Sequence, residues 1–423
     1  MLEIFSFLGI IILAILGVPL FVIMSLAALT AFSFTDVETS AVAVEIYRLS
    51  SAPTLLTIPL FTFAGYIMAE SKSPQRLLRF AEAALGWLPG GVAIVSLVIC
   101  AFFTAFTGAS GVTIIALGGL LYPILKNEGY TEKFSLGLIT TSGSLGLLFP
   151  PSLPIILYGL VAKVDIDQLF IAGIIPGILL IVVLSAWSIK NGTLSASSKK
   201  FEFSELVAAL KGCFWEAILP VGVLVGIYGG FTTATEAAAI TAFYILIIEC
   251  FVYKDLDIVK DIPKVTADSM SLVGGILLIL CCALGLTNYL VDEEIPMQIL
   301  DFMREFLTNK YSFLLFLNIF LLIVGSLMDI FSAIIVVVPL IVPIAQEFGV
   351  HPVHLAIIFL TNLEIGYITP PVGINLFISS FRFKKPVTEL YRASFPFLIL
   401  MLIALAIITY VPDLSLMLIG EGQ

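Results

Sequence analysis

The sequence is poor in charged residues. Asp, Glu, Lys and Arg make up 12% of its 423 residues, about half the share in soluble globular proteins, whereas 60% are hydrophobic. The hydrophobic residues form blocks close to the roughly 20 residues that a helix needs to cross a bilayer. The blocks with few or no charges are residues 4–34, 170–189, 213–230, 235–252, 267–290 and 394–411. We therefore predict an all-α polytopic membrane protein.

Other absences narrow the class of function. The five cysteines lie in or beside apolar blocks without metal-ligand spacing, which favours small core residues over disulfides or zinc ligands. The phosphate-binding pattern GxxxxGK[ST] is missing, so we expect no ATP hydrolysis of the usual kind. No catalytic set of residues stands out, and the net charge of −10 comes without a basic patch for nucleic acid. We therefore expect no enzyme, no cofactor and no nucleic-acid partner.

The positions of Lys and Arg predict how the chain crosses the membrane. Residues 1–34 lack a basic leading region and a small-residue cleavage signal, so they are expected to hold a retained first span. With a cytoplasmic N-terminus and two hairpins that enter and leave on one side, 16 Lys and Arg residues lie inside. The four that lie outside are Arg48, Lys163, Arg304 and Lys310. An extra or missing crossing would destroy this bias.

The sequence contains an old internal repeat. When it is shifted by 220 residues, its helix-breaking residues coincide without gaps. Gly65 meets Gly285, Pro123 meets Pro343, Gly129 meets Gly349, Gly146 meets Gly366, Pro150-Pro151 meets Pro370-Pro371, and Pro176 meets Pro396. The predicted topology gives the two copies opposite orientations, and inverted-topology repeats are typical of secondary transporters.

Each repeat is predicted to contain the same parts in the same order. The first repeat, 1–211, has scaffold spans 4–70, an amphipathic arm 73–86, a re-entrant hairpin 92–125, a broken helix 134–162 and a span 170–189. The second repeat, 212–423, has scaffold spans 213–290, an arm 296–308, a hairpin 313–345, a broken helix 352–380 and a span 394–411. The apolar faces of the arms favour helices at the membrane interface, although ordinary connectors are the alternative.

Four breaks interrupt these helices at predicted membrane depth. They are Thr107–Gly111, Gly325–Asp329 with Ser332, Thr140–Gly146 with Phe149–Ser152, and Thr361–Gly366 with Thr369–Pro371. Unpaired backbone groups survive at that depth only where protein or a polar cavity satisfies them. Freed carbonyls and hydroxyls suit Na⁺, and helix N-termini suit an anionic substrate. The alternative is a set of kinks and small-residue packing contacts.

Three acidic residues are predicted at membrane depth, where such residues are costly and indicate function. Asp329 lies in a hairpin tip and is the best candidate for a cation ligand. Glu364 lies beside the fourth break, where it could titrate, bind a cation or pair with a polar neighbour. For Glu236 a role as an acid at the start of a helix is the simpler account. We also place His351 and His354 in an outer loop.

Several segments together resemble a known family. They are GVPLFVIMSLAAL (17–29), TGASGVTIIALGGLLYP (107–123), SGSLGLLFPPSLPIILYG (142–159), YGGFTTATEAAA (228–239) and NLEIGYITPPVGINLF (362–377). They resemble the large membrane subunit of tripartite ATP-independent periplasmic (TRAP) transporters. The resemblance covers essentially the whole chain. The combination of TEAAA with the two Pro-Pro loops is specific, whereas any one segment alone would be weak.

The resemblance implies a prokaryotic inner-membrane permease of the ion-transporter superfamily. Such proteins take up organic acid anions with a sodium gradient, by an elevator motion of a transport domain against a scaffold. Their partners are a small membrane subunit of about four helices, here expected to be a separate chain, and a periplasmic substrate-binding protein. Sialic acid, C4-dicarboxylates, sulfonates and keto acids all remain open as substrates.

The resemblance also implies site residues. One sodium site would use Ser110, Ser142, Gly146 and Pro150, and the other would use Asp329, Asn362, Gly366, Thr369 and Pro370. The substrate would lie near Thr107, Ser110 and Asn375. The alternatives are a self-sufficient sodium/carboxylate transporter of the related elevator type, a membrane-embedded enzyme and a pore.

Overall fold

The computed structural model describes residues 9–10, 12–13, 16, 18–34, 44, 47, 53–191, 201–304, 307 and 309–419. In these residues all regular secondary structure is helical, and strands are absent. Within the described ranges, seven helices are long and apolar enough to cross a membrane, or up to ten if each bent helix pair counts as one span. The prediction of an all-α polytopic membrane protein is confirmed.

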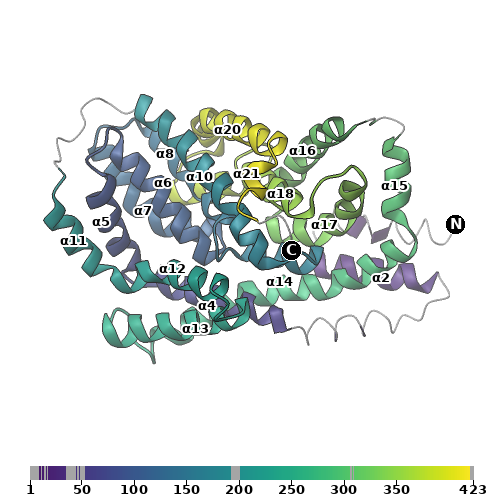
Figure 1. Cartoon of the computed structure of the whole chain (residues 1–423), viewed down its shortest axis with the longest axis horizontal. Coiled ribbons are helices and arrows are strands. Elements are labelled where there is room, and N and C mark those ends of the chain that lie inside the picture. Colours follow the sequence, from purple (N-terminus) through teal and green to yellow (C-terminus); the bar gives the residue numbers. More distant parts are fainter. Residues whose placement is uncertain are drawn as a thin grey trace.

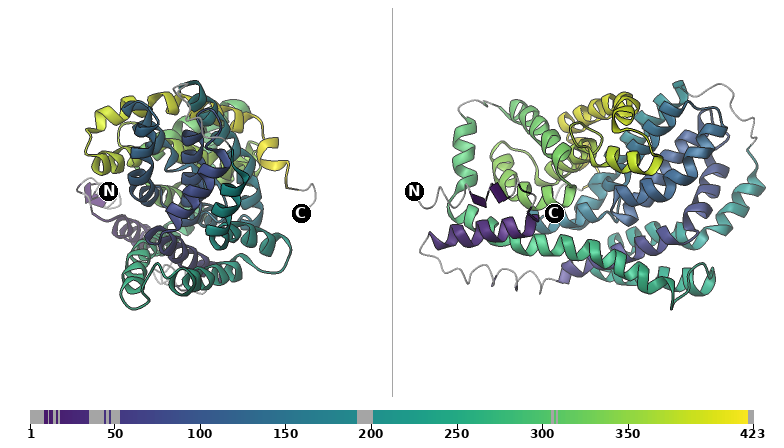
Figure 2. Two further views of the ribbon diagram at one scale, coloured as in Figure 1. Left: turned by 90° about the vertical axis from the view of Figure 1, so that its left-hand side faces the viewer. Right: turned by 180° about the vertical axis from the view of Figure 1, so that it is seen from behind.

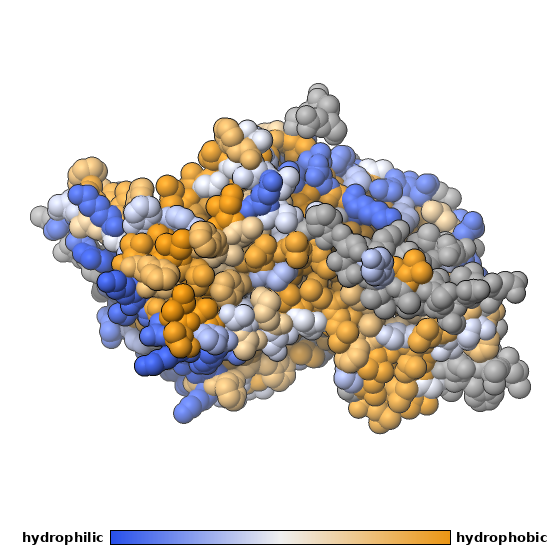
Figure 3. Space-filling model, turned by 90° about the horizontal axis from the view of Figure 1, so that it is seen from below, coloured by the Kyte–Doolittle hydropathy of each residue, from blue (hydrophilic) through white to orange (hydrophobic). Residues whose placement is uncertain are grey.

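Long helices form one layer along an edge of the molecule (Figures 1 and 2). We call this the scaffold layer. It consists of α2 (Leu20–Ser33), η1 (Pro53–Leu56), α4 (Thr57–Glu70), α12 (Phe214–Tyr228), α13 (Ala234–Ile247) with its π-turn η3 (Ile248–Val252), and α14 (Asp261–Asp292). Helix α14 packs against α2 and α4, and α13 packs against α4. Apolar residues cover much of the face of this layer shown in Figure 3.

The remaining long helices form a central bundle above the scaffold layer (Figure 1). From the first half it takes α6 (Gly91–Thr107), α7 (Ser110–Asn127), α8 (Glu132–Ser142), η2 (Leu145–Leu148), α9 (Leu153–Ala162) and α10 (Ile166–Asn191). From the second half it takes α16 (Lys310–Leu327), α17 (Ile330–Glu347), α18 (Pro352–Gly366), α19 (Ile374–Phe383), α20 (Val387–Tyr410) and the short α21 (Asp413–Leu416). The halves interlock, because α19 packs on α7 and α20 packs on α8.

The two halves repeat the same order of helices. Helices α7 and α17 begin and end 220 residues apart, at Ser110–Asn127 and Ile330–Glu347. The arms α5 (Ser73–Leu85) and α15 (Ile295–Arg304) stand at opposite ends of the molecule in Figure 1. Helix α5 is bent by 76° from α4, as an arm that leaves a membrane span requires. The predicted fold of two inverted-topology repeats, each with a re-entrant hairpin and a broken helix, is confirmed. The division at residues 211 and 212 stays a prediction.

Some expectations were wrong or fall outside the described residues. His351 lies in the exposed loop between α17 and α18, where it caps α18, but His354 lies buried within that helix, so the loop prediction was wrong for His354. A separate helix α11 (Phe203–Gly212), bent by 74° from α12, was missed because it has no long apolar run. Residues 4–8, 11, 14, 15 and 17 of the predicted first span, and 35–43, 45, 46 and 48–52 of the predicted scaffold spans, lie outside the described part of the chain. So do residues 305, 306 and 308 of the predicted second arm.

A buried cluster of charges joins the first arm to the scaffold layer. Arg76 on α5 forms ion pairs with Glu216 of α12, Glu249 of η3 and Asp255 beyond η3. Both glutamate side chains are fully buried, whereas 17% of the Arg76 side chain is exposed. The guanidinium also stacks over the Tyr253 ring, 3.8 Å from its centroid. One arginine therefore holds three acids that would otherwise repel one another.

Further polar groups complete this cluster. The Ser73 hydroxyl donates to Glu249 at 2.7 Å and lies 3.1 Å from a carboxylate oxygen of Glu216, and the Tyr253 hydroxyl donates to Glu216 at 3.0 Å. Burial by itself raises the pKa of Asp255, but the hydrogen bond and charge of Arg76 outweigh burial, so this pKa lies below its usual range. The base of the arm is thus fixed at the end of the molecule where α5 and α11 lie.

Candidate cation and substrate site

The tip of the first hairpin meets the second broken helix in the centre of the bundle. Ser110 begins α7, and its hydroxyl donates a 2.7 Å hydrogen bond to Oδ1 of Asn375, in the first turn of α19. The Asn375 amide nitrogen donates to the carbonyl of Thr140 on α8 at 3.3 Å. All three residues are buried. Ser110 and Asn375, two of the predicted substrate residues, are therefore brought together.

The third predicted substrate residue, Thr107, lies one turn away at the end of α6. Its hydroxyl is 3.5 Å from both the Ala109 carbonyl and the Thr113 hydroxyl. The turn between Thr107 and Ser110 depends on Gly108, whose φ of +63° is the left-handed conformation that glycine adopts freely. A Cβ on Gly108 would also lie 2.4 Å from the side chain of Leu153. The tip is therefore tightly packed against α9.

The first helix break lies beside the same tip. The Ser142 hydroxyl bonds within its own helix, to the Ile139 carbonyl at 3.2 Å. Thr104 on α6, which the sequence did not single out, donates to the Gly143 carbonyl at 2.7 Å. Thr104 was missed because it sits inside an apolar run. Among the described residues, the hydroxyls of Thr141 and Ser152 have no hydrogen-bond partner although both are buried. The break thus holds oxygen atoms that a ligand could use.

The second hairpin tip is bonded to the second break. The Ile330 amide donates to the Tyr367 hydroxyl at 2.8 Å, and the Gly373 amide donates to the Ser326 carbonyl at 3.2 Å. Asp329 caps α17, because one carboxylate oxygen accepts from the amides of Phe331 and Ser332 at 2.9 and 3.0 Å. Its other oxygen accepts from the Ser332 hydroxyl. A carboxylate has about four acceptor positions. These three hydrogen bonds leave one position for a cation.

Helix packing also explains why the two predicted sodium-site glycines, Gly146 and Gly366, have no side chain. A Cβ on Gly146 would lie 2.1 Å from the Ala101 carbonyl oxygen, and a Cβ on Gly366 would lie 2.4 Å from the backbone of Gly325. Both contacts are with backbone, which cannot move aside as a side chain can. Close helix packing alone therefore requires glycine here. Thr369, another predicted ligand, uses its hydroxyl to donate to the Ile365 carbonyl at 2.8 Å.

Gly366→Ala is expected to destabilise the protein by about 1–3 kcal/mol even without ligand, because the added methyl group overpacks the contact between α16 and α18. The apparent melting temperature of the purified protein would show this loss. Gly274→Ala on α14 is the matched control, since a Cβ there has no neighbour within 4 Å. Equal melting temperatures for Gly366→Ala and the control would contradict the packing account.

Two further acceptors in α18 are buried without partners. Neither carboxylate oxygen of Glu364, nor Oδ1 of Asn362, has a hydrogen-bond partner among the residues that the structure describes. Both side chains are 0% exposed. Such groups cost free energy unless something satisfies them. They mark α18 as a place where a cation, a proton or water is needed.

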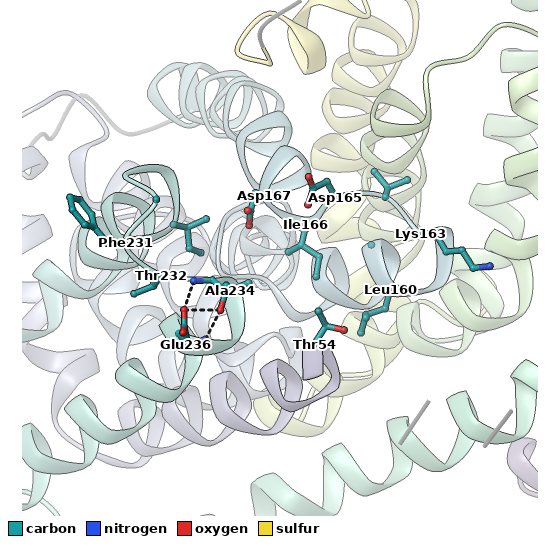
Figure 4. Close-up of a pocket in the computed structure, with 15 residues that line it drawn as sticks. Thr54, Leu160, Lys163, Asp165, Ile166, Asp167, Phe231, Thr232, Ala234 and Glu236 are labelled. Atoms are coloured by element: carbon teal, nitrogen blue, oxygen red, sulfur yellow. Dashed lines mark hydrogen bonds between the residues drawn. The ribbon is translucent and has the colours of Figure 1, made fainter. Parts of the chain in front are cut away.

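An open cleft of about 820 Å³ lies elsewhere, between the central bundle and the scaffold layer (Figure 4). Its lining includes Lys163, Asp165, Phe231 and Glu236, but none of the predicted sodium or substrate residues. Glu236 forms a capping box with Thr233 at the start of α13, which confirms the simpler account of this acid. The cleft separates the α9–α10 turn from the α12–α13 turn.

Comparison with known proteins gives a consistent result. A family profile described as "Tripartite ATP-independent periplasmic transporter, DctM component" matches residues 7–414. The C4-dicarboxylate TRAP transporter large permease protein DctM of Pseudomonas aeruginosa is 35% identical over 393 residues, which cover 92% of each chain. The isethionate TRAP transporter permease protein DctMQ of Oleidesulfovibrio alaskensis is 35% identical over 410 residues, covering 96% of this chain and 64% of that protein.

A solved structure shares the fold at low sequence identity. The YdaH transporter of Alcanivorax borkumensis superposes with a TM-score of 0.58 and 12% identity. The match covers 88% of this chain and 86% of that one. At this identity the likeness concerns the fold alone.

Proposed function

Because this chain belongs to the tripartite ATP-independent periplasmic transporter family, as its DctM component, we propose that it takes up a small organic acid anion by sodium-coupled secondary transport. A periplasmic binding protein delivers the anion, and the central bundle carries it across the membrane by an elevator-type motion. Two of the relatives are named for transport of C4-dicarboxylate and isethionate, and these organic acid anions support the substrate class without choosing its member. Another relative is named for ectoine, which is a zwitterion at neutral pH.

One observation carries this proposal. Two hairpin tips and two helix breaks converge at a buried polar centre inside an otherwise apolar bundle, through the Ser110–Asn375 and Ser326–Gly373 contacts. Broken helices at membrane depth supply amides for an anion and carbonyls for Na⁺. The first amides of α7, at the tip that bears Ser110, suit the substrate carboxylate or sulfonate.

We place one sodium ion near the first hairpin and one near the second. The first site would take Ser110, Ser142, Gly146 and Pro150, and the second Asp329, Asn362, Gly366, Thr369 and Pro370. Glycine and proline would contribute their carbonyl oxygens. The unpartnered Oδ1 of Asn362 and the spare capacity of the Asp329 carboxylate support the second site.

The two layers of the fold suit an elevator motion. The scaffold layer and the central bundle form two layers that pack on each other through α4 and α6 and through α14 and α17, and α5 and α15 connect them at opposite ends (Figure 1). Arg76 anchors the base of α5 on the scaffold side. A bundle held by two arms can shift along the scaffold while the site between its hairpin tips stays intact.

The proposed transporter has two protein partners. We expect a small TRAP membrane subunit of about four helices and a periplasmic binding protein, with the chain in a prokaryotic inner membrane and its N-terminus in the cytoplasm. The exposed apolar side chains of the scaffold layer, such as Val221, Val225 and Phe243, suit contact with lipid or with that subunit.

Dependence on the binding protein tests the proposed function against its closest rival. Proteoliposomes with this chain and its small subunit would be given labelled organic acids, with and without the cognate binding protein. We expect saturable uptake of one acid only when the binding protein is present. Equal uptake without it would establish instead a self-sufficient sodium/carboxylate transporter.

Glu364→Gln is expected to keep sodium-driven uptake within about threefold of the unaltered protein, because the proposed sodium sites do not include Glu364 and glutamine preserves its shape. Initial uptake rates at saturating Na⁺ would measure this. A loss of coupling in Glu364→Gln, with normal folding, would instead make this carboxyl group part of the coupling machinery.

A further inference from the structure

A buried chain of hydrogen bonds links Asn362 to two neighbouring helices. The Asn362 amide nitrogen donates to Oδ1 of Asn318 on α16 at 2.7 Å. The Asn318 amide nitrogen donates to the Thr409 hydroxyl on α20 at 3.1 Å. These three side chains come from segments that are far apart in the sequence, and each is buried. A buried polar network of this kind stabilises one geometry when its groups are satisfied and costs free energy where they are not.

The contacts fix which way the Asn362 amide points. Its nitrogen also donates to the Ile358 carbonyl, one turn earlier on α18, at 2.8 Å. A backbone carbonyl can only accept, so the opposite orientation would set two oxygens against each other. Asn318 then uses the second hydrogen of the same nitrogen. Both donors are occupied, and Oδ1 is left as the one free group, without a partner among the described residues.

His354 contacts Thr409, the last residue of this chain of hydrogen bonds, and holds it in place. Its Nε2 lies 3.2 Å from the Thr409 carbonyl, which can only accept, so Nε2 must carry the proton. Nδ1 can then accept from the Ser415 hydroxyl, also at 3.2 Å. Helix α18 is therefore held at two points. His354 joins it to the end of α20, and Asn362, eight residues later, joins it to Asn318 on α16. This double attachment limits rotation of α18 about its axis.

We propose that Asn318 is a positioning residue for cation binding, which holds the Asn362 amide so that its Oδ1 faces the cation. Thr409 supports Asn318 in turn. This inference rests on the proposed sodium coupling and adds residues outside the second sodium site to it. Asn318 does not touch the ion. Together with the Ile358 carbonyl, it holds the amide nitrogen away from the cation, which that nitrogen would repel.

Sodium binding by the purified protein tests this inference directly. The readouts are the Na⁺ concentration that gives half of the maximal rise in melting temperature, and the half-saturating Na⁺ concentration for uptake by the complete three-component system. Asn318→Leu removes the acceptor at similar volume. We expect it to raise both concentrations at least about tenfold, as loss of an outer-shell partner does in metal sites, with little change in maximal uptake.

Three further variants keep the test decisive. Asn318→Asp retains an acceptor for Asn362 and is expected to bind Na⁺ more tightly than Asn318→Leu. Thr409→Ser, which keeps the hydroxyl, is expected to lose less affinity than Thr409→Val. If Asn318→Leu does not fold, the Thr409 pair still gives the comparison. Ser188→Ala is the control. It also removes a buried hydroxyl, which donates to the Leu184 carbonyl on α10, but this hydroxyl is not part of the Asn362–Asn318–Thr409 network.

The outcomes separate this inference from the proposed function. Variants that melt earlier, yet respond to Na⁺ at unchanged concentrations, would show that Asn318 and Thr409 are structural only. An unaltered protein that responds to Na⁺ in neither readout would overturn sodium coupling, and the inference with it.

Discussion

Replacing Asp329 with asparagine is expected to lower sodium-driven uptake at least about tenfold, a loss of about 1.4 kcal/mol or more, while the protein stays folded. Asp329 both caps α17 and carries the negative charge of the second hairpin tip. Asparagine caps a helix as well as aspartate does but brings no charge. The substitution therefore separates the structural role of this residue from its proposed role toward Na⁺.

Asp329→Ala completes the comparison. Alanine removes the cap as well as the charge, so we expect the same loss of uptake and, in addition, about 1 kcal/mol of lost stability. Initial uptake rates over a range of Na⁺ concentrations, together with melting temperatures, measure the two effects. Uptake in Asp329→Asn that matches the unaltered protein would leave Asp329 as a helix cap and remove it from the second sodium site.

Arg76→Gln is expected to destabilise the protein by about 3–5 kcal/mol, because it leaves Glu216 and Glu249 buried without a counter-charge. Removal of one partner from a buried ion pair costs more than the pair itself contributes. The arm α5 would lose its anchor on the scaffold layer. We therefore expect a lower melting temperature, and lower uptake per folded molecule because the bundle is no longer held.

A neighbouring ion pair provides the control for Arg76. Arg79, one turn along α5, pairs with Glu205 of α11 at 2.8 Å, but both side chains are largely exposed. Exposed pairs are screened by water and contribute little. Arg79→Gln is therefore expected to leave melting and uptake nearly unchanged. Equal effects of Arg76→Gln and Arg79→Gln would contradict the anchoring role of the buried cluster.

Much of the fold could be predicted because the bilayer restricts the choices. Backbone groups at membrane depth must be satisfied, so apolar blocks form helices and Gly or Pro marks where they break. The predicted hairpins 92–125 and 313–345 therefore lie within two residues of α6–α7 and within three of α16–α17 at each end. The repeat added independent support, since each break occurs twice.

Contacts between distant segments could not be predicted. Arg76 meets acids 140 to 179 residues away, and the ring nitrogens of His354 contact Thr409 and Ser415, which follow it by 55 and 61 residues. Periodicity describes one helix at a time and does not show which helices face each other. Asn318 was overlooked for the same reason, as a single polar residue in an apolar run. Ser110 and Asn375 were paired only through the family resemblance.

Uptake driven by an imposed ion gradient tests the central claim most directly. The three-component transporter would be reconstituted in proteoliposomes and given its labelled anion under an inward Na⁺ gradient, a K⁺ gradient of equal size, or a proton gradient without Na⁺. Sodium coupling predicts saturable accumulation under the Na⁺ gradient alone. Equal accumulation under the proton gradient without Na⁺ would contradict it, and would make Asp329 and Glu364 the groups to examine as proton carriers.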